Sequence, residues 1–147
     1  MLMTGSVQID AERAFARAAR ARRRAALVRA LRRRSADGRP AVYDERRLRS
    51  RAAVAQGIRE IPVEAISGTL EPSRASLFDR SFRPAKLAAC RWTRVWLAEQ
   101  RGAVLPPISV VRVGDGYAVR DGHHRVSVAR ARGAETIDAT VDGVAFA

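Results

Sequence analysis

The first third of the chain alternates apolar and basic residues in a pattern unlike that of the rest. Alanine, arginine and leucine dominate from Asp10 to about residue 35, and nothing interrupts them before Asp37, which predicts a long helix. A second basic helix is expected over 45–56. The apolar stripe of the first helix is broken by three consecutive arginines, so we expect this helix to lie on the surface or to project from it. The stripe residues are Phe15, Ala19, Leu27 and Leu31.

From residue 58 onward the pattern becomes that of a small α+β domain. β-Branched residues predict a strand over 58–66, which Pro62 should either place at a sheet edge or break into two pieces. The remaining elements are a loop over 67–84, a helix over 84–101, strands over 108–113 and 117–120, a helix over 126–132 and a strand over 136–141. We therefore expect two parts: a basic helical arm over 1–57, and a domain over 58–147 with a small mixed sheet.

The helix over 84–101 carries its apolar residues at helical spacing. Ala88, Trp92, Val95 and Trp96 should form its buried face, because aromatic residues at this spacing are usually part of a core. The single cysteine, Cys90, is expected to be a small core residue of the same helix. One cysteine forms no internal disulfide, which fits a reducing cytoplasm.

The net charge of +13 suggests nucleic acid as a possible partner. Residues 11–51 hold fifteen arginines against four acidic residues, so the basic arm from Arg13 to Arg51 could contact DNA or RNA. Only one of the 28 basic residues is a lysine, and such a bias also arises from an arginine-rich coding background. No apolar run is long enough for a membrane span, so we expect no membrane partner.

The main candidate functional residues form one stretch, Asp121-Gly122-His123-His124-Arg125, which holds both histidines of the chain. A strand precedes this stretch and a helix follows it, and free amides at a helix start bind phosphate. Gly122 would allow close approach, Arg125 could bind two phosphate oxygens, and His124 could donate a hydrogen bond. His123 could likewise donate to a phosphate or act as an acid or base, and Asp121 could orient a histidine or hold a metal-bound water.

Two alternatives to a phosphate site stay open for this stretch. Asp121 could simply cap the helix, with both imidazoles on the surface. A structural zinc is disfavoured because adjacent histidines on a helix diverge and no other ligand spacing accompanies them, so we expect no metal site.

The same residues resemble the ParB/sulfiredoxin-like (ParB-like nuclease) superfamily over about 58–142. The resemblance rests on Leu105-Pro106-Pro107-Ile108 followed by the stretch 121–126, and on Gly133. The segment 78–84, ahead of Trp92, resembles a small bacterial subfamily that has the same Asp-Gly-His-His-Arg motif. The superfamily implies a turn that holds nucleotide phosphates. In sulfiredoxins a catalytic cysteine occupies the position of His123, so sulfiredoxin activity is not expected.

The resemblance also suggests two residues outside the turn. Arg74 matches an arginine that partition proteins often carry after their first strand, and it would help to bind the nucleotide. Glu64 is a candidate for the carboxylate base of free-serine kinases of this fold, although a solvent-facing strand residue is the simpler interpretation. The implied cofactor is a nucleoside triphosphate or diphosphate with Mg²⁺.

Two function hypotheses follow. The first is a binding protein that holds a nucleotide at 121–125 and contacts nucleic acid through the arm. The second is a nucleotide-dependent phosphotransferase, with Asp121, His123 and Glu64 as candidate catalytic residues. A nuclease ranks third, because the sequence lacks a dense acidic cluster for metal ions.

Overall fold

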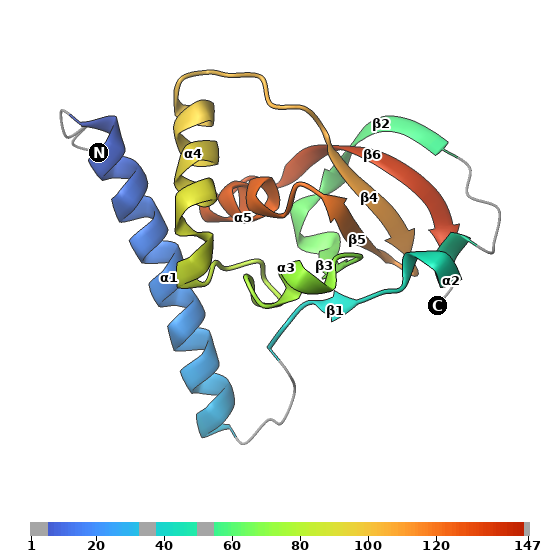
Figure 1. The fold of residues 1–147 in the computed structure, drawn as a ribbon, viewed down its shortest axis with the longest axis horizontal. Coiled ribbons are helices and arrows are strands. Elements are labelled where there is room, and N and C mark those ends of the chain that lie inside the picture. Colours follow the sequence, from blue (N-terminus) through green and yellow to red (C-terminus); the bar gives the residue numbers. More distant parts are fainter. Residues whose placement is uncertain (1–5, 33–37, 50–54, 146–147) are drawn as a thin grey trace.

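A computed structural model describes residues 6–32, 38–49 and 55–145. These residues form a six-stranded mixed sheet in the order β1-β3-β5-β4-β6-β2, with the helices layered beside it (Figure 1). The strands are β1 (Ala41–Val42), β2 (Ala55–Pro62), β3 (Ile66–Thr69), β4 (Ile108–Val113), β5 (Gly116–Asp121) and β6 (Thr136–Ala145). The expected α+β class, with a small mixed sheet and an arginine-rich helix before it, is confirmed.

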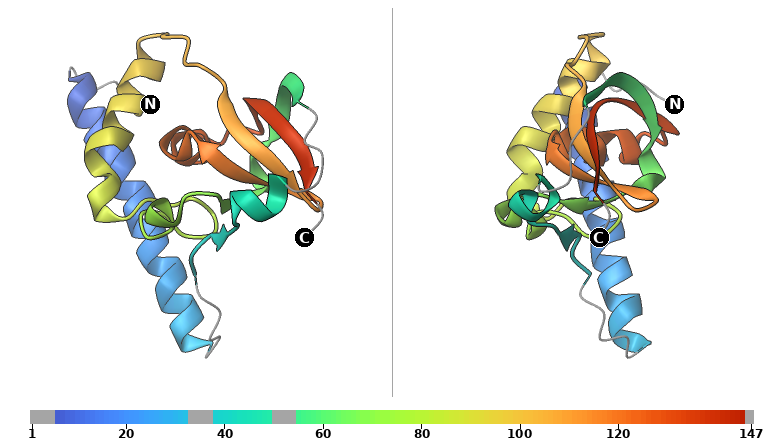
Figure 2. Two further views of the ribbon diagram at one scale, coloured as in Figure 1. Left: turned by 45° about the vertical axis from the view of Figure 1, so that its right-hand side comes forward. Right: turned by 90° about the vertical axis from the view of Figure 1, so that its right-hand side faces the viewer.

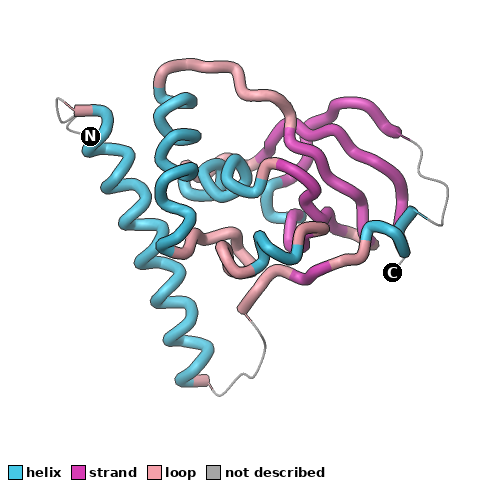
Figure 3. The backbone as a smooth tube through the Cα atoms, viewed as in Figure 1, coloured by secondary structure: helices cyan, strands magenta, loops and turns pink. Residues whose placement is uncertain are grey.

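The helices stack outward from the sheet in the order α5, α4, α1, as two further views and the tube drawing show (Figures 2 and 3). The main core lies between the sheet and α5, where Val126 packs against Val110 and Val119. The helices are α1 (Val7–Leu31), α2 (Glu45–Arg49), α3 (Pro72–Ala75), α4 (Ala89–Gln100) and α5 (His123–Ala131), with 3-10 turns η1 (Val63–Ala65) and η2 (Lys86–Ala88).

The helix α1 is docked over its first half and projects over its second. Ala11, Ala14 and Ala19 are buried, and the ring of Phe15 meets Trp92 edge-on at a centroid distance of 5.5 Å. Alanine allows close helix packing, so the docking face needs no continuous stripe of large residues. Leu31 remains exposed at the projecting end (Figure 1).

Two sequence predictions before residue 70 need correction. The helix expected over 45–56 ends at Arg49, residues 50–54 lie outside the described part, and Ala55 already belongs to β2. The strand expected over 58–66 is divided at Pro62, as the proline allowed: β2 ends there at the sheet edge, and β3 begins at Ile66. Part of the expected loop over 67–84 is thus strand, and α3 occupies another part.

Two predictions for α4 had different outcomes. Ala88 and Trp92 are fully buried, with Val95 and Trp96 partly buried beside them, as expected. Cys90, expected in the core, is exposed. It lies two residues from Trp92, and residues at that spacing point to opposite sides of a helix.

The proposed division at Gly57 is crossed by several contacts. α1 packs on α4, β1 pairs with β3, and Arg120 of β5 forms an ion pair with Glu45 at 2.8 Å. Arg120 also donates to Asp142 and, over 3.1 Å, to Ser109. The division into two parts remains a prediction.

Candidate functional site

The site is built on the turn between β5 and α5, where Gly122 has the backbone angles φ 107° and ψ 22°. L-residues rarely adopt this conformation. A Cβ atom at Gly122 would also lie 2.5 Å from Cγ2 of Ile108. Both constraints require glycine here, and they allow α5 to begin directly at His123.

The first turn of α5 leaves its amide groups without acceptors. The first helical hydrogen bond runs from Val126 N to Gly122 O over 3.0 Å, and no side chain caps the helix. In the described part of the chain, the amides of residues 123–125 therefore have no hydrogen-bond acceptor. Three free donors at the positive end of a helix dipole form a site that favours an anion.

His123 is buried and fixed by the end of β3. Its Nε2 atom lies 2.7 Å from Oγ1 of Thr69, and the rings of Phe78 and Phe82 lie beside the imidazole with centroids 6.4 Å away. Burial, followed by the charges of Arg74 and His124, lowers the pKa of His123 to about 4. The imidazole is therefore neutral at pH 7, and the alternative that it lies on the surface is wrong.

His124 is also buried, and its ring has no hydrogen-bond partner among the residues described. The Phe78 ring meets it edge-on at a centroid distance of 5.2 Å. Burial, followed by the positive charges of Arg74 and Arg91, lowers the pKa of His124 to about 4. The ring nitrogens are not among the fully buried polar atoms that lack a partner, so a ligand at the turn could reach this neutral imidazole.

Arg74 and Arg91 place positive charge beside this turn. Arg74, predicted from the sequence, influences both histidines from α3. Arg91 lies on α4 and was missed by sequence reasoning, since only the packing of α4 brings its charge near His124. No local motif marked it.

Arg125 has a different environment from the one expected. Its guanidinium folds back over Gly122, donates to the carbonyl oxygen of Pro106, and forms an ion pair with Asp121 at 3.2 Å. The Arg125 side chain is only 15% exposed, whereas that of Asp121 is 80% exposed. Arg125 therefore ties the segment before β4 to the turn, and part of its donor capacity is used within the protein.

Glu64 is placed away from the turn. It is exposed on η1, and its charge acts on Arg130, which lies seven residues beyond His123 and so about 10 Å along α5. The structure brings together Arg74, Gly122, His123, His124 and, through its backbone amide, Arg125. It does not bring Glu64 to them.

The described residues offer neither a metal site nor a membrane-spanning helix. They contain no group of three or more histidine, cysteine or acidic residues placed to hold a metal ion. Nor does any helix in residues 6–32, 38–49 or 55–145 combine the length and apolar character needed to cross a membrane.

A likeness to known proteins is found in structure and not in sequence. No family model matches the sequence, and no curated protein matches it. Among solved structures, the chain is similar to sulfiredoxin from Arabidopsis thaliana, with 22% sequence identity and a TM-score of 0.40. The match covers 59% of this chain and 86% of that chain. A likeness at this level assigns no activity to this protein.

Proposed function

We propose that the chain is a nucleotide-phosphate-binding protein of the ParB/sulfiredoxin-like superfamily, with its site at the start of α5. The observation that carries the proposal is the partnerless, buried ring of His124 beside three free amides and the charge of Arg74. Each of these groups favours an oxyanion, and they come from separate elements. The superfamily assignment rests on the resemblance of the turn residues.

The phosphate oxygens would accept from the amides of residues 123–125, with Arg74 supplying positive charge. His124 would donate one hydrogen bond as a neutral ring. Arg125 would hold the turn in shape through Pro106. Mg²⁺ would arrive with the nucleotide phosphates, since this ion commonly binds through substrate phosphates and one or two carboxylates, and Asp121 is an exposed carboxylate at the site.

A thermal-shift screen of ATP, ADP, CTP and GTP with Mg²⁺ tests the proposal. A ligand should raise the melting temperature of the native chain and should lose most of this effect in Arg74→Ala. Arg112→Ala is the matched control, because Arg112 is also half-buried but lies at the other end of the β4–β5 hairpin. The absence of a shift with all four nucleotides would overturn the proposal, as would equal shifts in the two variants.

No observation favours the phosphotransferase alternative with Glu64 as its base, because Glu64 lies beside Arg130. The variant Asp121→Asn separates the two hypotheses further. If Asp121 only adds negative charge near an anion site, its loss should tighten nucleotide binding. If Asp121 holds the metal ion of a catalytic complex, its loss should weaken binding in the presence of Mg²⁺.

A second component of the proposed function is nucleic-acid binding through α1, in a cytoplasmic protein. Four arginines follow the spacing i, i+4, i+7 and i+11, which places them on one face of the helix. None has an acidic partner in the described part of the chain. They are Arg13, Arg17, Arg20 and Arg24. Binding to an oligonucleotide at two salt concentrations tests this component, and no binding at low salt would overturn it.

A further inference from the structure

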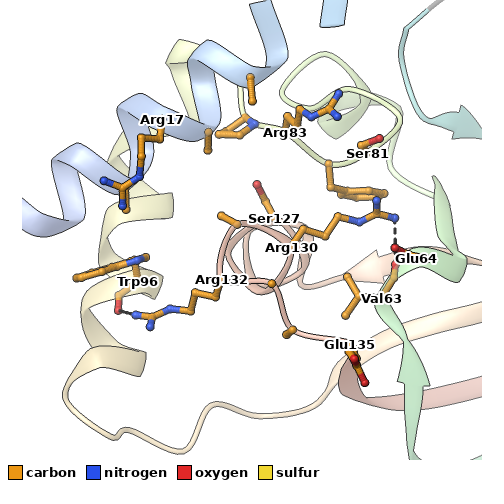
Figure 4. A pocket seen from close by; sticks show the side chains of 18 of the residues that line it. Arg17, Val63, Glu64, Ser81, Arg83, Trp96, Ser127, Arg130, Arg132 and Glu135 are labelled. Atoms are coloured by element: carbon orange, nitrogen blue, oxygen red, sulfur yellow. Dashed lines mark hydrogen bonds between the residues drawn. The ribbon is translucent and has the colours of Figure 1, made fainter. Parts of the chain in front are cut away.

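A large cleft lies between α1 and the C-terminal end of α5, whereas the histidine turn is at the N-terminal end of α5. Its volume is about 1390 Å³, and α1, the segment 81–84, η1 and the end of α5 form its walls. Figure 4 shows Arg17 entering from α1 on one side and Arg130 extending from α5 on the other. The cleft thus lies between the basic arm and the rest of the chain.

The lining of the cleft is rich in guanidinium groups. Five arginines line it, against the three acidic residues Asp10, Glu64 and Glu135. Two of the five are neutralised locally: Arg83 pairs with Asp79 at 3.3 Å, and Arg132 pairs with Glu99 at 3.1 Å. The remaining three, Arg13, Arg17 and Arg130, form no ion pair with a described residue, although the charges of Glu64 and Asp79 act on Arg130.

Arg130 is only partly satisfied by the protein. Its Nη2 atom donates to the carbonyl oxygens of Val63 at 3.0 Å and Ile66 at 2.7 Å, and its guanidinium stacks 5.9 Å from the Phe82 ring. Its Nε atom is buried without an acceptor. The printed hydrogen bonds of this guanidinium use only Nη2, so the protein takes up part of the donor capacity of a residue that lines the cleft.

The charged surface continues from the cleft along α1. Arg13 and Arg17 line the cleft, and the helical spacing of Arg20 and Arg24 places them on the same face nearer the C-terminal end of α1. Side chains three and four residues apart on a helix are about 5–6 Å apart, so the four guanidinium groups form a regular track. A phosphodiester backbone carries charges at regular intervals, and guanidinium groups bind phosphate through two parallel hydrogen bonds.

We propose that this cleft binds the backbone of single-stranded nucleic acid, which runs from Arg130 across Arg13 and Arg17 and out along α1. The inference deepens the proposed nucleic-acid function of the arm and rests on it. The cleft volume exceeds the roughly 300–1,000 Å³ of small-molecule pockets, which suits a few nucleotides of one strand rather than a single small ligand. Basic grooves that follow the backbone are how proteins bind single strands without sequence preference.

The first test is the salt dependence of binding to a fluorescent single-stranded oligonucleotide. Arg13→Ala and Arg17→Ala should each weaken binding. Each should also make the negative slope of log K against log salt shallower by about 0.7, the value for one phosphate contact on a single strand. Arg23→Ala is the matched control, because Arg23 is an exposed arginine of the same helix outside this face. Its slope should remain that of the native chain. An equal effect of all three changes would overturn the cleft site while the arm function stands.

The second test locates the strand. The change Cys90→Ser removes the only cysteine, and Ser81→Cys then places one in the cleft wall, whereas Asp115→Cys places one at the tip of the β4–β5 hairpin. With an azidophenacyl label on the thiol, ultraviolet light should cross-link the strand to the variant at Ser81 and not to the variant at Asp115. Cross-linking at neither position, or only to duplex, would overturn the cleft proposal. No binding by the native chain would overturn the arm function as well.

Discussion

The Nε2 atom of His123 lies 2.7 Å from the Oγ1 atom of Thr69, a contact that joins the end of β3 to the first residue of α5. The Glu71 amide also donates to this oxygen, over 2.9 Å. The contact to Nε2 is the shortest that the hydroxyl makes, and the tautomer of the ring decides which of the two groups donates. This contact fixes one edge of the neutral imidazole.

Replacing Thr69 should show how much this contact contributes to the free energy of unfolding. Thr69→Val leaves both His123 Nε2 and the Glu71 amide without a partner, and a lost buried partner costs about 1–3 kcal/mol. Thr69→Ser keeps the hydroxyl and should cost less. Urea unfolding followed by circular dichroism measures both. Equal midpoints for the two variants would show that the hydroxyl contributes nothing.

The two histidines should make the protein less stable in mild acid. Each has a folded pKa of about 4, below the ordinary 6.5, so the unfolded chain binds protons that the folded chain does not. Stability should therefore be constant above about pH 6.5 and fall as the pH drops toward 4, by up to about 1.4 kcal/mol per pH unit for each histidine. Thermal unfolding across this range tests the expectation. The double variant His123→Gln, His124→Gln should flatten the profile, and an unchanged slope in it would assign the effect to other groups.

Two glycines allow the strain and the crowding at the turn to be separated. Gly122 has φ 107° and a Cβ position 2.5 Å from Ile108, whereas Gly102 has φ 76° and nothing within 4 Å of its Cβ position. Gly102→Ala should cost about 1–2 kcal/mol for the left-handed backbone alone. Gly122→Ala should cost more, because Ile108 must also move. Chemical unfolding of both variants gives the difference, and equal losses would show that the turn absorbs the clash freely.

The docking of α1 should contribute to global stability. Phe15→Ala removes the ring that meets Trp92 edge-on, and we expect a loss of about 1–3 kcal/mol. Leu31→Ala changes a residue that is 75% exposed on the same helix and should alter stability by no more than about 0.5 kcal/mol. Thermal unfolding followed by tryptophan fluorescence compares them. Identical melting temperatures would mean that α1 contributes no packing energy.

The local features of this protein could be predicted from its residues alone. Alanine, leucine and arginine favour α1 whatever surrounds them, and Gly114-Asp115-Gly116 fixes the β4–β5 hairpin through its turn. The spacing of Ala88 and Trp92 identified the buried face of α4. Each of these features depends on the backbone propensity of the residues or on the spacing of apolar residues within one element. A short stretch of sequence contains both kinds of information.

Which distant groups meet depends on how the helices and strands pack against one another. Neither the exposure of Cys90 nor the remoteness of Glu64 from His123 could be predicted, because each depends on which neighbour covers a given face. The same holds for Arg91, whose charge reaches His124 through the packing of α4 on α5. Arg125 matched the motif in sequence, yet the fold directs its guanidinium to Pro106 and Asp121. Side-chain partners across elements follow from packing, and packing is a property of the whole chain rather than of any local pattern.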